Sequence, residues 1–256
     1  MNFQNGDFMD EVFVDAEFSE LMIHGTNSIG VCLSDHQMKQ FFQYYRMLIE
    51  TNKVMNLTAI TELSDVVSKH FLDSLSLVKV VKDLSQKEYS IIDVATGAGF
   101  PGIPLKIAYP NLKITLLDSL NKRVKFLQNV IDELGLNNIE GMHGRAEDYG
   151  LNTKYREKYD LCVSRAVANL STLSEYCLPF VKVGGSFISY KSGTIEEEGK
   201  QAKGAIKILG GKIQEVLKFS LEEAEAERSF IVIEKKDRIS AKYPRKAGMP
   251  SKDPLK

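Results

Sequence analysis

A glycine-rich turn and a carboxylate near the middle of the chain have the spacing of a ligand site. Residues 91–104 read Ile-Ile-Asp-Val-Ala-Thr-Gly-Ala-Gly-Phe-Pro-Gly-Ile-Pro, an apolar strand that runs into the turn and then a helix. Glycine lets the backbone approach a ligand closely and adopt dihedral angles that a Cβ would forbid. Asp118 follows 21 residues after Gly97, at the end of the next apolar run, where a carboxylate can accept hydrogen bonds from ribose hydroxyls. The pattern predicts a ligand that contains adenosine.

Two classes of ligand suit this turn, a dinucleotide and S-adenosylmethionine. Gly97, Gly99 and Gly102 match the dinucleotide fingerprint G-x-G-x-x-G. However, Pro101 and Pro104 remove amide donors from the helix start, where a pyrophosphate would bind. S-adenosylmethionine has no phosphate, so the turn favours it, and a nicotinamide-dependent oxidoreductase stays as the alternative.

The second half of the chain has the pattern of an α/β protein with a Rossmann-like, mostly parallel sheet. Short runs rich in Val, Ile and Leu alternate with helical stretches, as strands do when crossover helices join them. Seven strands are predicted, at residues 90–95, 112–118, 138–143, 158–164, 185–190, 212–219 and 229–235. Helices are predicted at residues 102–109, 121–134, 170–181 and 195–209. Only about nine residues separate the last two strands, too few for a crossover, so that pair should be antiparallel.

Amphipathic helices are predicted before the sheet. Residues 10–24 and 34–51 carry apolar side chains at spacings of three and four, and Ser34 and Asp35 supply a cap for the second helix. A third helix is predicted over residues 62–82. We therefore expect a helical cap (1–84), a Rossmann-like domain (85–236) and a basic C-terminal tail (237–256) that is extended.

The charges are unevenly distributed along the 256 residues, although the net charge is only -1. Residues 1–38 hold seven acidic side chains and no Lys or Arg, whereas residues 235–256 hold eight basic and two acidic ones. A basic end on a neutral body suits a polyanionic partner, but a solvated end explains the same charges. By itself the charge favours the second interpretation.

Composition excludes several classes of protein. With 43% hydrophobic and 26% charged residues, the chain is neither a collagen, a coiled coil nor a disulfide scaffold. The sequence has no apolar run long enough for a membrane helix and no signal peptide, so we expect a cytoplasmic protein. Cys32, Cys162 and Cys177 lack the spacing of a zinc site and are expected to be buried free thiols.

Short segments from about residue 30 to the C-terminus match the motifs of one family when taken together. Beside the glycine turn, they are Asn56-Leu57-Thr58, His70-Phe71-Leu72-Asp73-Ser74-Leu75, Leu117-Asp118-Ser119-Leu120-Asn121-Lys122-Arg123, Arg145-Ala146-Glu147-Asp148, Ser164-Arg165-Ala166, Lys191-Ser192-Gly193 and Lys242-Tyr243-Pro244-Arg245-Lys246-Ala247-Gly248. In these segments the sequence resembles the bacterial small-subunit ribosomal RNA guanine-N7 methyltransferases, also called glucose-inhibited division protein B or RsmG.

The resemblance implies that S-adenosylmethionine lies against the turn, with its ribose and adenine held by the segments that follow. The implied contacts are Ala95, Gly97 and Phe100 in the turn, Asp118, Ser119 and Leu120 at the ribose, Ala146 and Glu147 at the adenine, and Arg165 near the reacting end. The family usually has glycine where this chain has Ala95. A positive φ there would strain the turn, whereas a negative φ would not.

Several of these residues also have a simpler structural explanation. Asp93 could fix the amides of the turn, and Glu147 and Asp148 could begin a helix. Arg165 could be an ion-pair partner, yet it follows an apolar strand at the carboxyl edge of the sheet, where ligands bind in such folds.

The segment after the fourth strand bears on the reaction. Residues 164–169 read Ser-Arg-Ala-Val-Ala-Asn, without the Pro-Pro-aromatic motif common for amino acceptors or the cysteine used for carbon acceptors. Guanine N7 carries a free lone pair in the plane of the ring and needs no base. We therefore assign no catalytic acid or base, and we expect His70 and His143 to be hydrogen-bonded structural residues.

The expected partner is 16S ribosomal RNA or the small ribosomal subunit, bound by a monomer. Since phosphate contacts dominate affinity for RNA, we expect contacts from Arg123, Lys191, Lys242, Arg245 and Lys246. Tyr243 could stack on an unpaired base or anchor the C-terminal tail to the body. A noncatalytic RNA-binding assembly factor remains a further alternative.

Overall fold

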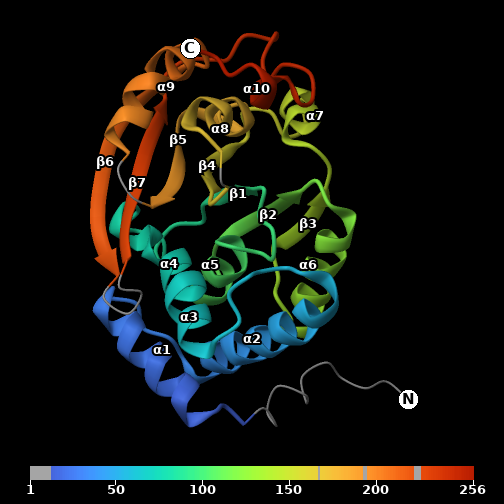
Figure 1. Ribbon diagram of the computed structural model, residues 1–256, viewed down its shortest axis with the longest axis vertical. Helices are drawn as coiled ribbons and strands as arrows, with labels where there is room; N and C mark the ends of the chain where they lie inside the picture. Colours follow the sequence, from blue (N-terminus) through green and yellow to red (C-terminus); the bar gives the residue numbers. More distant parts are fainter. Residues whose placement is uncertain (1–12, 167, 193–194, 222–225) are drawn as a thin grey trace.

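A single seven-stranded sheet with helices on both faces forms the centre of the molecule (Figure 1). The computed structural model describes residues 13–166, 168–192, 195–221 and 226–256. The strands are β1 (Ser90–Val94), β2 (Lys113–Asp118), β3 (Ile139–His143), β4 (Tyr159–Ser164), β5 (Val181–Ser192), β6 (Gly211–Leu221) and β7 (Ala226–Lys235). Their order is β3-β2-β1-β4-β5-β7-β6. Strands β1 to β5 are parallel, and β7 is antiparallel to both β5 and β6, which confirms the predicted strands and the antiparallel pair.

The central strands β1, β2 and β4 are mostly apolar, because both of their faces are covered. Consecutive residues of a strand point to opposite faces, so Ile91 joins one hydrophobic cluster and Ile92 the other. Leu116 and Leu117 on β2 divide between the two clusters in the same way. The sheet therefore has a packed layer on each side and leaves its strand ends to form the site.

The helices that connect and follow the strands agree with the prediction except at α7, α8 and α10. They are α5 (Gly102–Ala108), α6 (Asn121–Glu133), α7 (Ala146–Leu151), α8 (Leu170–Cys177), α9 (Glu196–Ile208) and α10 (Met249–Lys252). Helix α8 ends before the predicted residue 181, because Pro179 has no N–H with which to continue the hydrogen bonds of the helix. The short helices α7 and α10 were not among the predicted helices, although a helix start at Glu147 was the alternative for that segment.

Helices α1 (Ala16–Ser28) and α2 (Asp35–Met55) lie at the lower end of the molecule in Figure 1. The predicted cap of α2 is confirmed, since the Ser34 side chain accepts from the Gln37 amide and Gln37 bonds back to the Ser34 amide. Phe41, Tyr44 and Leu48 of α2 are buried in the same cluster as one face of the sheet. The cap and the sheet thus share a hydrophobic core, while the domain boundaries at residues 84 and 236 stay a prediction.

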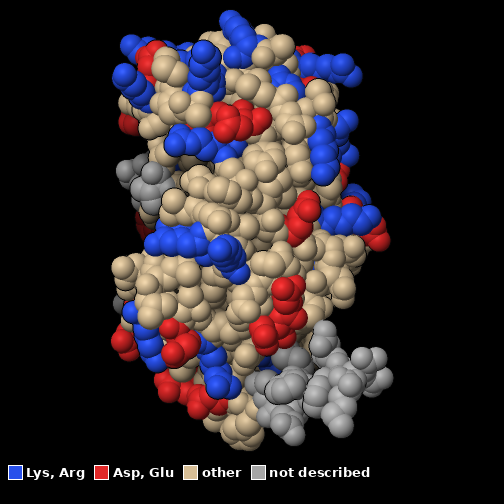
Figure 2. All heavy atoms as spheres, turned by 90° about the vertical axis from the view of Figure 1, so that its right-hand side faces the viewer, with Lys and Arg blue, Asp and Glu red and all other residues tan. Residues whose placement is uncertain are grey.

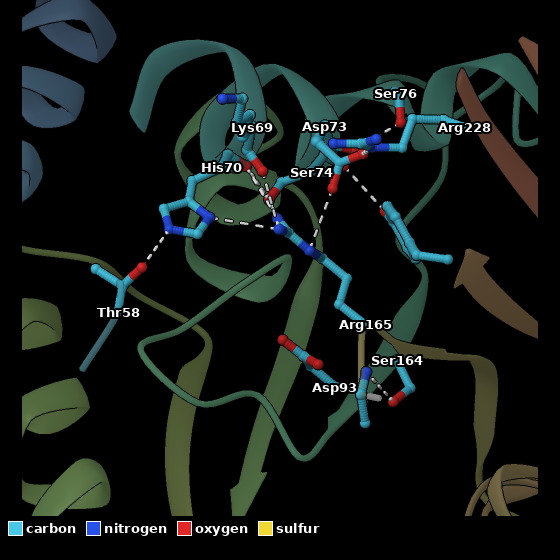
Figure 3. A network of polar contacts seen from close by, with 12 residues as sticks. Thr58, Lys69, His70, Asp73, Ser74, Ser76, Asp93, Ser164, Arg165 and Arg228 are labelled. Atoms are coloured by element: carbon cyan, nitrogen blue, oxygen red, sulfur yellow. Dashed lines mark hydrogen bonds and ion pairs between the residues drawn. The ribbon is translucent and has the colours of Figure 1, made fainter. Parts of the chain in front are cut away.

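The predicted third helix is a succession of short helical segments. They are α3 (Leu63–Val66), a π-helical turn (Val67–Leu72), α4 (Asp73–Leu75) and a 3₁₀ turn (Ser76–Lys79). A π-helical turn inside an α-helix is often found at a functional site, because it shifts the side chains that follow it. Here it brings His70 and Asp73 toward the carboxyl ends of the strands (Figure 3).

The prediction of an extended C-terminal tail is wrong, because the tail packs on the body of the protein. Arg156 donates from Nη1 to the Tyr243 carbonyl at 2.7 Å and from Nη2 to the Ile239 carbonyl at 3.0 Å. The tail follows the upper end of the molecule in Figure 1, beside α7 and α8. Its Lys and Pro residues follow no helical or strand periodicity, so the sequence pattern did not predict that the tail packs on the body.

The three cysteines agree only in part with the prediction of buried thiols. Cys162 and Cys177 are buried free thiols as predicted, but Cys32 is exposed. No helix among the described residues has the length and apolar character needed to cross a bilayer.

Candidate active site

Asp93 holds the start and the end of the glycine turn together. Its Oδ2 accepts a hydrogen bond from the Thr96 hydroxyl at 2.6 Å and another from the Gly102 amide at 2.9 Å. The structural role considered for Asp93 is therefore confirmed. Its Oδ1 is buried without a partner among the described residues, and burial raises the pKa of this carboxyl to about 7. A Cβ at Gly102 would lie 2.2 Å from Leu116 Cδ2, so only glycine allows α5 to approach the sheet this closely.

Asp118 at the end of β2 ties the turn to the neighbouring strand. Its Oδ2 accepts from the Gly97 amide at 2.9 Å, and its Oδ1 accepts from the Leu120 amide at 2.9 Å. The second lone pair of Oδ1 can accept a hydroxyl group, and among the described residues Oδ2 has only the long 3.5 Å contact with Arg123 Nη1 besides its bond to Gly97. Gly97 has a φ of +64°, and a Cβ there would meet no atom within 4 Å, so the turn has an open side.

Ala95 has a φ of +60°, which is the left-handed region that disfavours every residue with a Cβ. Because φ is positive, the turn is strained at Ala95. The strained residue is exposed and borders the cavity described below. Strain of this kind persists where the surrounding contacts fix the backbone, here the amide of Ala95 bonded to the Leu117 carbonyl at 2.9 Å.

We expect Ala95→Gly to raise the free energy of unfolding by about 1 kcal/mol, because glycine adopts the left-handed region without strain. Urea denaturation measures the change. Ala202→Gly, in the interior of α9, is the control and should lower stability, since a helical alanine has no such strain to relieve. An Ala95→Gly protein no more stable than the wild type would contradict the assignment of strain.

A first cavity of about 430 Å³ opens beside the turn at the carboxyl ends of β1, β2 and β3. The residues that line it from the strands and from α7 include Val94, Ala95, Leu117, Ser119, Ala146 and Glu147. Val94, Leu117 and Ala146 offer apolar walls to a flat ring, and the Asp118 carboxylate lies at the neighbouring turn. This combination fits the adenosine part of S-adenosylmethionine. The start of α5 offers no array of free amides to a pyrophosphate, because Pro101 and Pro104 have no N–H and the Gly102 and Ile103 amides are bonded to Asp93 and to the Gly99 carbonyl.

The C-terminal tail completes the first cavity, which the sequence did not predict. Gly248 and Lys252 line it, and the Gly248 amide donates to Glu147 Oε1 at 2.8 Å. Glu147 is buried in the first turn of α7, so the alternative of a helix start is confirmed as well. The motif around Lys246 and Gly248 was visible in the sequence, but no spacing rule connects it with Glu147, 101 residues earlier.

The implied ligand residues divide into two groups. Ala95, Ser119, Ala146 and Glu147 line the first cavity, and Gly97, Asp118 and Leu120 are joined by hydrogen bonds next to it. Phe100 and Arg165 are not among the residues that line it. The Phe100 ring instead stacks on His70 with centroids 4.4 Å apart, and the Arg165 guanidinium carbon lies 5.6 Å from its centroid.

Arg165 fastens the helical cap to the rim of the sheet (Figure 3). Its Nε lies 3.2 Å from Asp73 Oδ2, and its Nη1 donates to the His70 carbonyl at 3.2 Å and to Ser74 Oγ at 3.1 Å. Its Nη2 donates to the Lys69 carbonyl at 2.9 Å and lies 3.4 Å from His70 Nδ1. These contacts engage all the N–H groups of a guanidinium. The ion-pair role considered for Arg165 is thus present.

The two histidines have the structural roles that the sequence predicted. His70 Nε2 lies 2.8 Å from the Thr58 hydroxyl, and burial together with the Arg165 charge lowers the pKa of this imidazole to about 3. A neutral, hydrogen-bonded ring of this kind has no proton to give near neutral pH. His143 Nε2 lies 3.2 Å from the Ser119 carbonyl.

A second cavity of about 630 Å³ opens at the ends of β4, β5 and β7, and Asp73, Arg165, Lys191 and Arg228 are among its lining residues. The first cavity lies at the ends of β1, β2 and β3. Because β1 and β4 are adjacent while their connections run to opposite sides, the two cavities flank the crevice where ligands bind in open α/β sheets.

The predicted RNA contacts are spread around these cavities. Arg123 is partly exposed, with Nη1 3.5 Å from Asp118 Oδ2, and Lys191 Nζ lies 2.7 Å from Glu198 Oε1 in the second cavity. Lys242 and Lys246 are exposed on the C-terminal tail. Figure 2 shows Lys and Arg gathered toward the upper end of the face that carries α6 and α7, which is where the tail lies in Figure 1.

Two other residues of the tail anchor it to the body. Tyr243 is only 7% exposed, so anchoring is confirmed and stacking on a base is wrong for this ring. Arg245 donates from Nη2 to Glu175 Oε2 at 2.7 Å and from its amide to Glu175 Oε1 at 2.8 Å. The cation that was expected to bind phosphate is therefore held by a buried carboxylate of the protein itself.

Comparison with known proteins gives concordant matches. Residues 37–230 match the model of the GidB family, described as rRNA small subunit methyltransferase G. A protein of Acetivibrio thermocellus named ribosomal RNA small subunit methyltransferase G is 51% identical over 247 residues, which cover 96% of this chain and all of the relative. One of the same name from Lachnoclostridium phytofermentans is 52% identical over 233 residues, 91% of this chain and 96% of the relative.

Solved structures with little sequence similarity share the fold. The protein MtNAS, in complex with MTA and tNA, superposes with a TM-score of 0.52 at 14% identity, over 87% of this chain and 78% of that chain. A candidate sarcosine dimethylglycine methyltransferase from Galdieria sulphuraria superposes with a TM-score of 0.51 at 12% identity, over 77% of this chain and all of the other. The Rossmann-like methyltransferase fold is thereby confirmed.

Proposed function

Because the chain belongs to the rRNA small subunit methyltransferase G family, we propose that it transfers a methyl group from S-adenosylmethionine to N7 of a guanine in 16S ribosomal RNA. The observation that carries the proposal is the first cavity, with apolar walls and an adjacent turn bonded to Asp118. We propose further that the protein is a monomer, that it acts in the cytoplasm, and that its substrate is 16S ribosomal RNA or the small ribosomal subunit.

The residues of the first cavity suit the parts of the methyl donor. Asp118 would accept hydrogen bonds from the ribose diol, and Val94, Leu117 and Ala146 would enclose the adenine. When bound, S-adenosylmethionine supplies a methyl group carried by a positively charged sulfur. Ala95 lines the cavity with a small side chain, and the backbone at Gly97, two residues later, is open.

The chain needs no general base for this reaction. Guanine N7 has a lone pair in the ring plane, and no proton has to be removed from it before attack. His70 is neutral and hydrogen-bonded, and Arg165 has its N–H groups engaged, so neither is placed to move a proton. The protein would then act by alignment and exclusion of water, which can contribute roughly 7 to 11 kcal/mol in well-oriented systems.

The second cavity is the proposed place of the acceptor. It adjoins β4, lies next to the donor side of the crevice and is lined by Arg165, Lys191 and Arg228. In-line attack requires access to guanine N7, which an unpaired loop nucleotide or one pulled from its stack provides.

Mass spectrometry of ribosomal RNA from a strain without this gene, compared with its parent, tests the proposal. We expect one 7-methylguanosine of the small-subunit RNA to be lost, and an unchanged modification pattern would contradict the proposal. S-adenosylhomocysteine should raise the melting temperature while NAD and NADP should not, because only a bound ligand shifts the unfolding equilibrium. The reverse result would favour the oxidoreductase.

A further inference from the structure

Arg228 at the beginning of β7 presents unused hydrogen-bond donors to the second cavity. Its Nε donates to Asp73 Oδ1 at 3.0 Å, and its Nη1 donates to the Glu227 carbonyl at 3.2 Å. Within the described residues, Nη2 has no hydrogen-bond partner, and the side chain lines the second cavity with 18% of its surface exposed. The guanidinium is thus held at one end and open at the other.

Arg165 and Arg228 differ in how many of their N–H groups are bonded within the protein. Both guanidinium groups pair with the carboxylate of Asp73, but Arg165 has its other donors bonded to the helical cap. The charged residues that line the second cavity are Arg165, Lys191 and Arg228 against Asp73 and Glu198, which leaves an excess of one positive charge. Arg165 is saturated, and Lys191 Nζ already contacts Glu198 Oε1 and the Ala168 carbonyl. Arg228, whose Nη2 has no partner within the described residues, is therefore the cation that we assign to a ligand.

The aromatic side chains of the same cavity are poorly placed to stack a base. The Phe219 ring is stacked on the buried Phe230 ring with centroids 5.1 Å apart, and Lys79 Nζ lies 5.4 Å from its centroid. Tyr190 is buried and donates its hydroxyl to the Ser74 carbonyl. To a ligand, the cavity therefore offers positive charge and hydrogen-bond donors rather than an aromatic surface for stacking.

Chemistry also favours phosphate over the base as the partner of this guanidinium. Arginine commonly reads guanine with two hydrogen bonds, to O6 and N7. Such a contact would occupy N7, the atom that must stay free to accept the methyl group. A guanidinium binds phosphate through two parallel hydrogen bonds as well, and the remaining N–H groups of Nη1 and Nη2 suit that geometry.

We propose that Arg228 binds a backbone phosphate of the RNA beside the acceptor guanine, and that Asp73 is a positioning residue that fixes the guanidinium. This inference rests on the proposed function and names the contact that brings the RNA into the second cavity. Ser192 on β5 is exposed and is paired with Arg228 on β7 in the sheet. It therefore lies beside the proposed phosphate contact.

The test measures binding of small-subunit ribosomal RNA by the full chain at several salt concentrations. Arg228→Gln should raise Kd about 10-fold at low salt, because one charge-assisted contact is lost. It should also lower the log-log salt slope by about 0.7, the value for one single-strand phosphate. Affinity for S-adenosylhomocysteine should not change. Lys212→Gln, an exposed lysine at the opposite end of β6, is the matched control and should leave both RNA quantities unchanged.

A second variant, Arg228→Lys, protects the test against a folding defect, since lysine keeps the charge next to Asp73. We expect it to retain the wild-type salt slope with an affinity between those of the wild type and Arg228→Gln, because lysine binds phosphate as a point charge. Wild-type affinity and slope in Arg228→Gln, or equal losses in Lys212→Gln, would overturn the inference. If the wild type still methylates RNA, only this inference fails; if it transfers no methyl group, the proposed function fails.

Discussion

Replacing Asp118 by alanine is expected to weaken binding of S-adenosylmethionine by about 100-fold. The carboxylate would accept the ribose hydroxyls, and it already holds the amides of Gly97 and Leu120 at 2.9 Å each. Hydrogen bonds to a charged group contribute about 1.5 to 3 kcal/mol each, so the loss of two reaches this factor. Isothermal titration calorimetry with S-adenosylmethionine measures it directly.

Two comparisons make the Asp118 result specific. Glu133→Ala changes an exposed carboxylate at the end of α6 and should leave donor affinity unaltered. RNA affinity should stay within about twofold in Asp118→Ala, because the carboxylate is buried beside the turn and offers no positive charge to a phosphate. A donor affinity equal to that of the wild type would show that the ribose is held elsewhere.

Replacing Arg245 by alanine is expected to lower the free energy of unfolding by about 3 to 5 kcal/mol. Glu175 is fully buried, and Arg245 contacts both of its carboxylate oxygens through Nε and Nη2. Removing the cation leaves a buried carboxylate without its charge partner, which is strongly destabilising. Urea denaturation monitored by circular dichroism measures the loss.

The neighbouring Lys246 provides the control for Arg245. Lys246→Ala removes an exposed cation from the same tail and should change stability by less than about 0.5 kcal/mol. The proposed role of Lys246 in RNA binding would appear as a smaller salt slope. If Arg245→Ala unfolds at the urea concentration of the wild type, the tail is not anchored through Glu175.

The sheet could be predicted from the sequence because its signals are local. Each buried strand is a short run of β-branched and leucine side chains, and the short connection between β6 and β7 dictates an antiparallel pair. The turn from Asp93 to Gly102 and the acid at Asp118 were recognisable because the chemistry of a ribose contact fixes their spacing.

The remaining features depend on residues that are far apart in the chain. Arg165 meets Asp73 across 92 positions of sequence and shares it with Arg228, and nothing in local spacing reports such a pair. The positive φ of Ala95 follows from how the turn is bonded to Leu117, so the residue type alone left the sign of φ open. The packing of the tail likewise depends on Glu175, a polar residue buried inside α8.

The network around Arg165 also connects the two halves of the site. Phe100 belongs to the glycine turn, and its ring contacts both His70 of the helical cap and Arg165 at the end of β4. Asp73 then joins Arg165 to Arg228 in the second cavity (Figure 3). The donor turn and the proposed acceptor cavity therefore share one set of packed side chains.

Methyl transfer to guanine N7 can be followed with S-adenosylmethionine that carries an isotope-labelled methyl group. The purified chain is incubated with small ribosomal subunits that lack the modification, or with 16S ribosomal RNA, and the RNA is digested to nucleosides for mass spectrometry. We expect the label to appear in 7-methylguanosine. RNA that stays unlabelled on both substrates, or a label on any other nucleoside or atom, would contradict it.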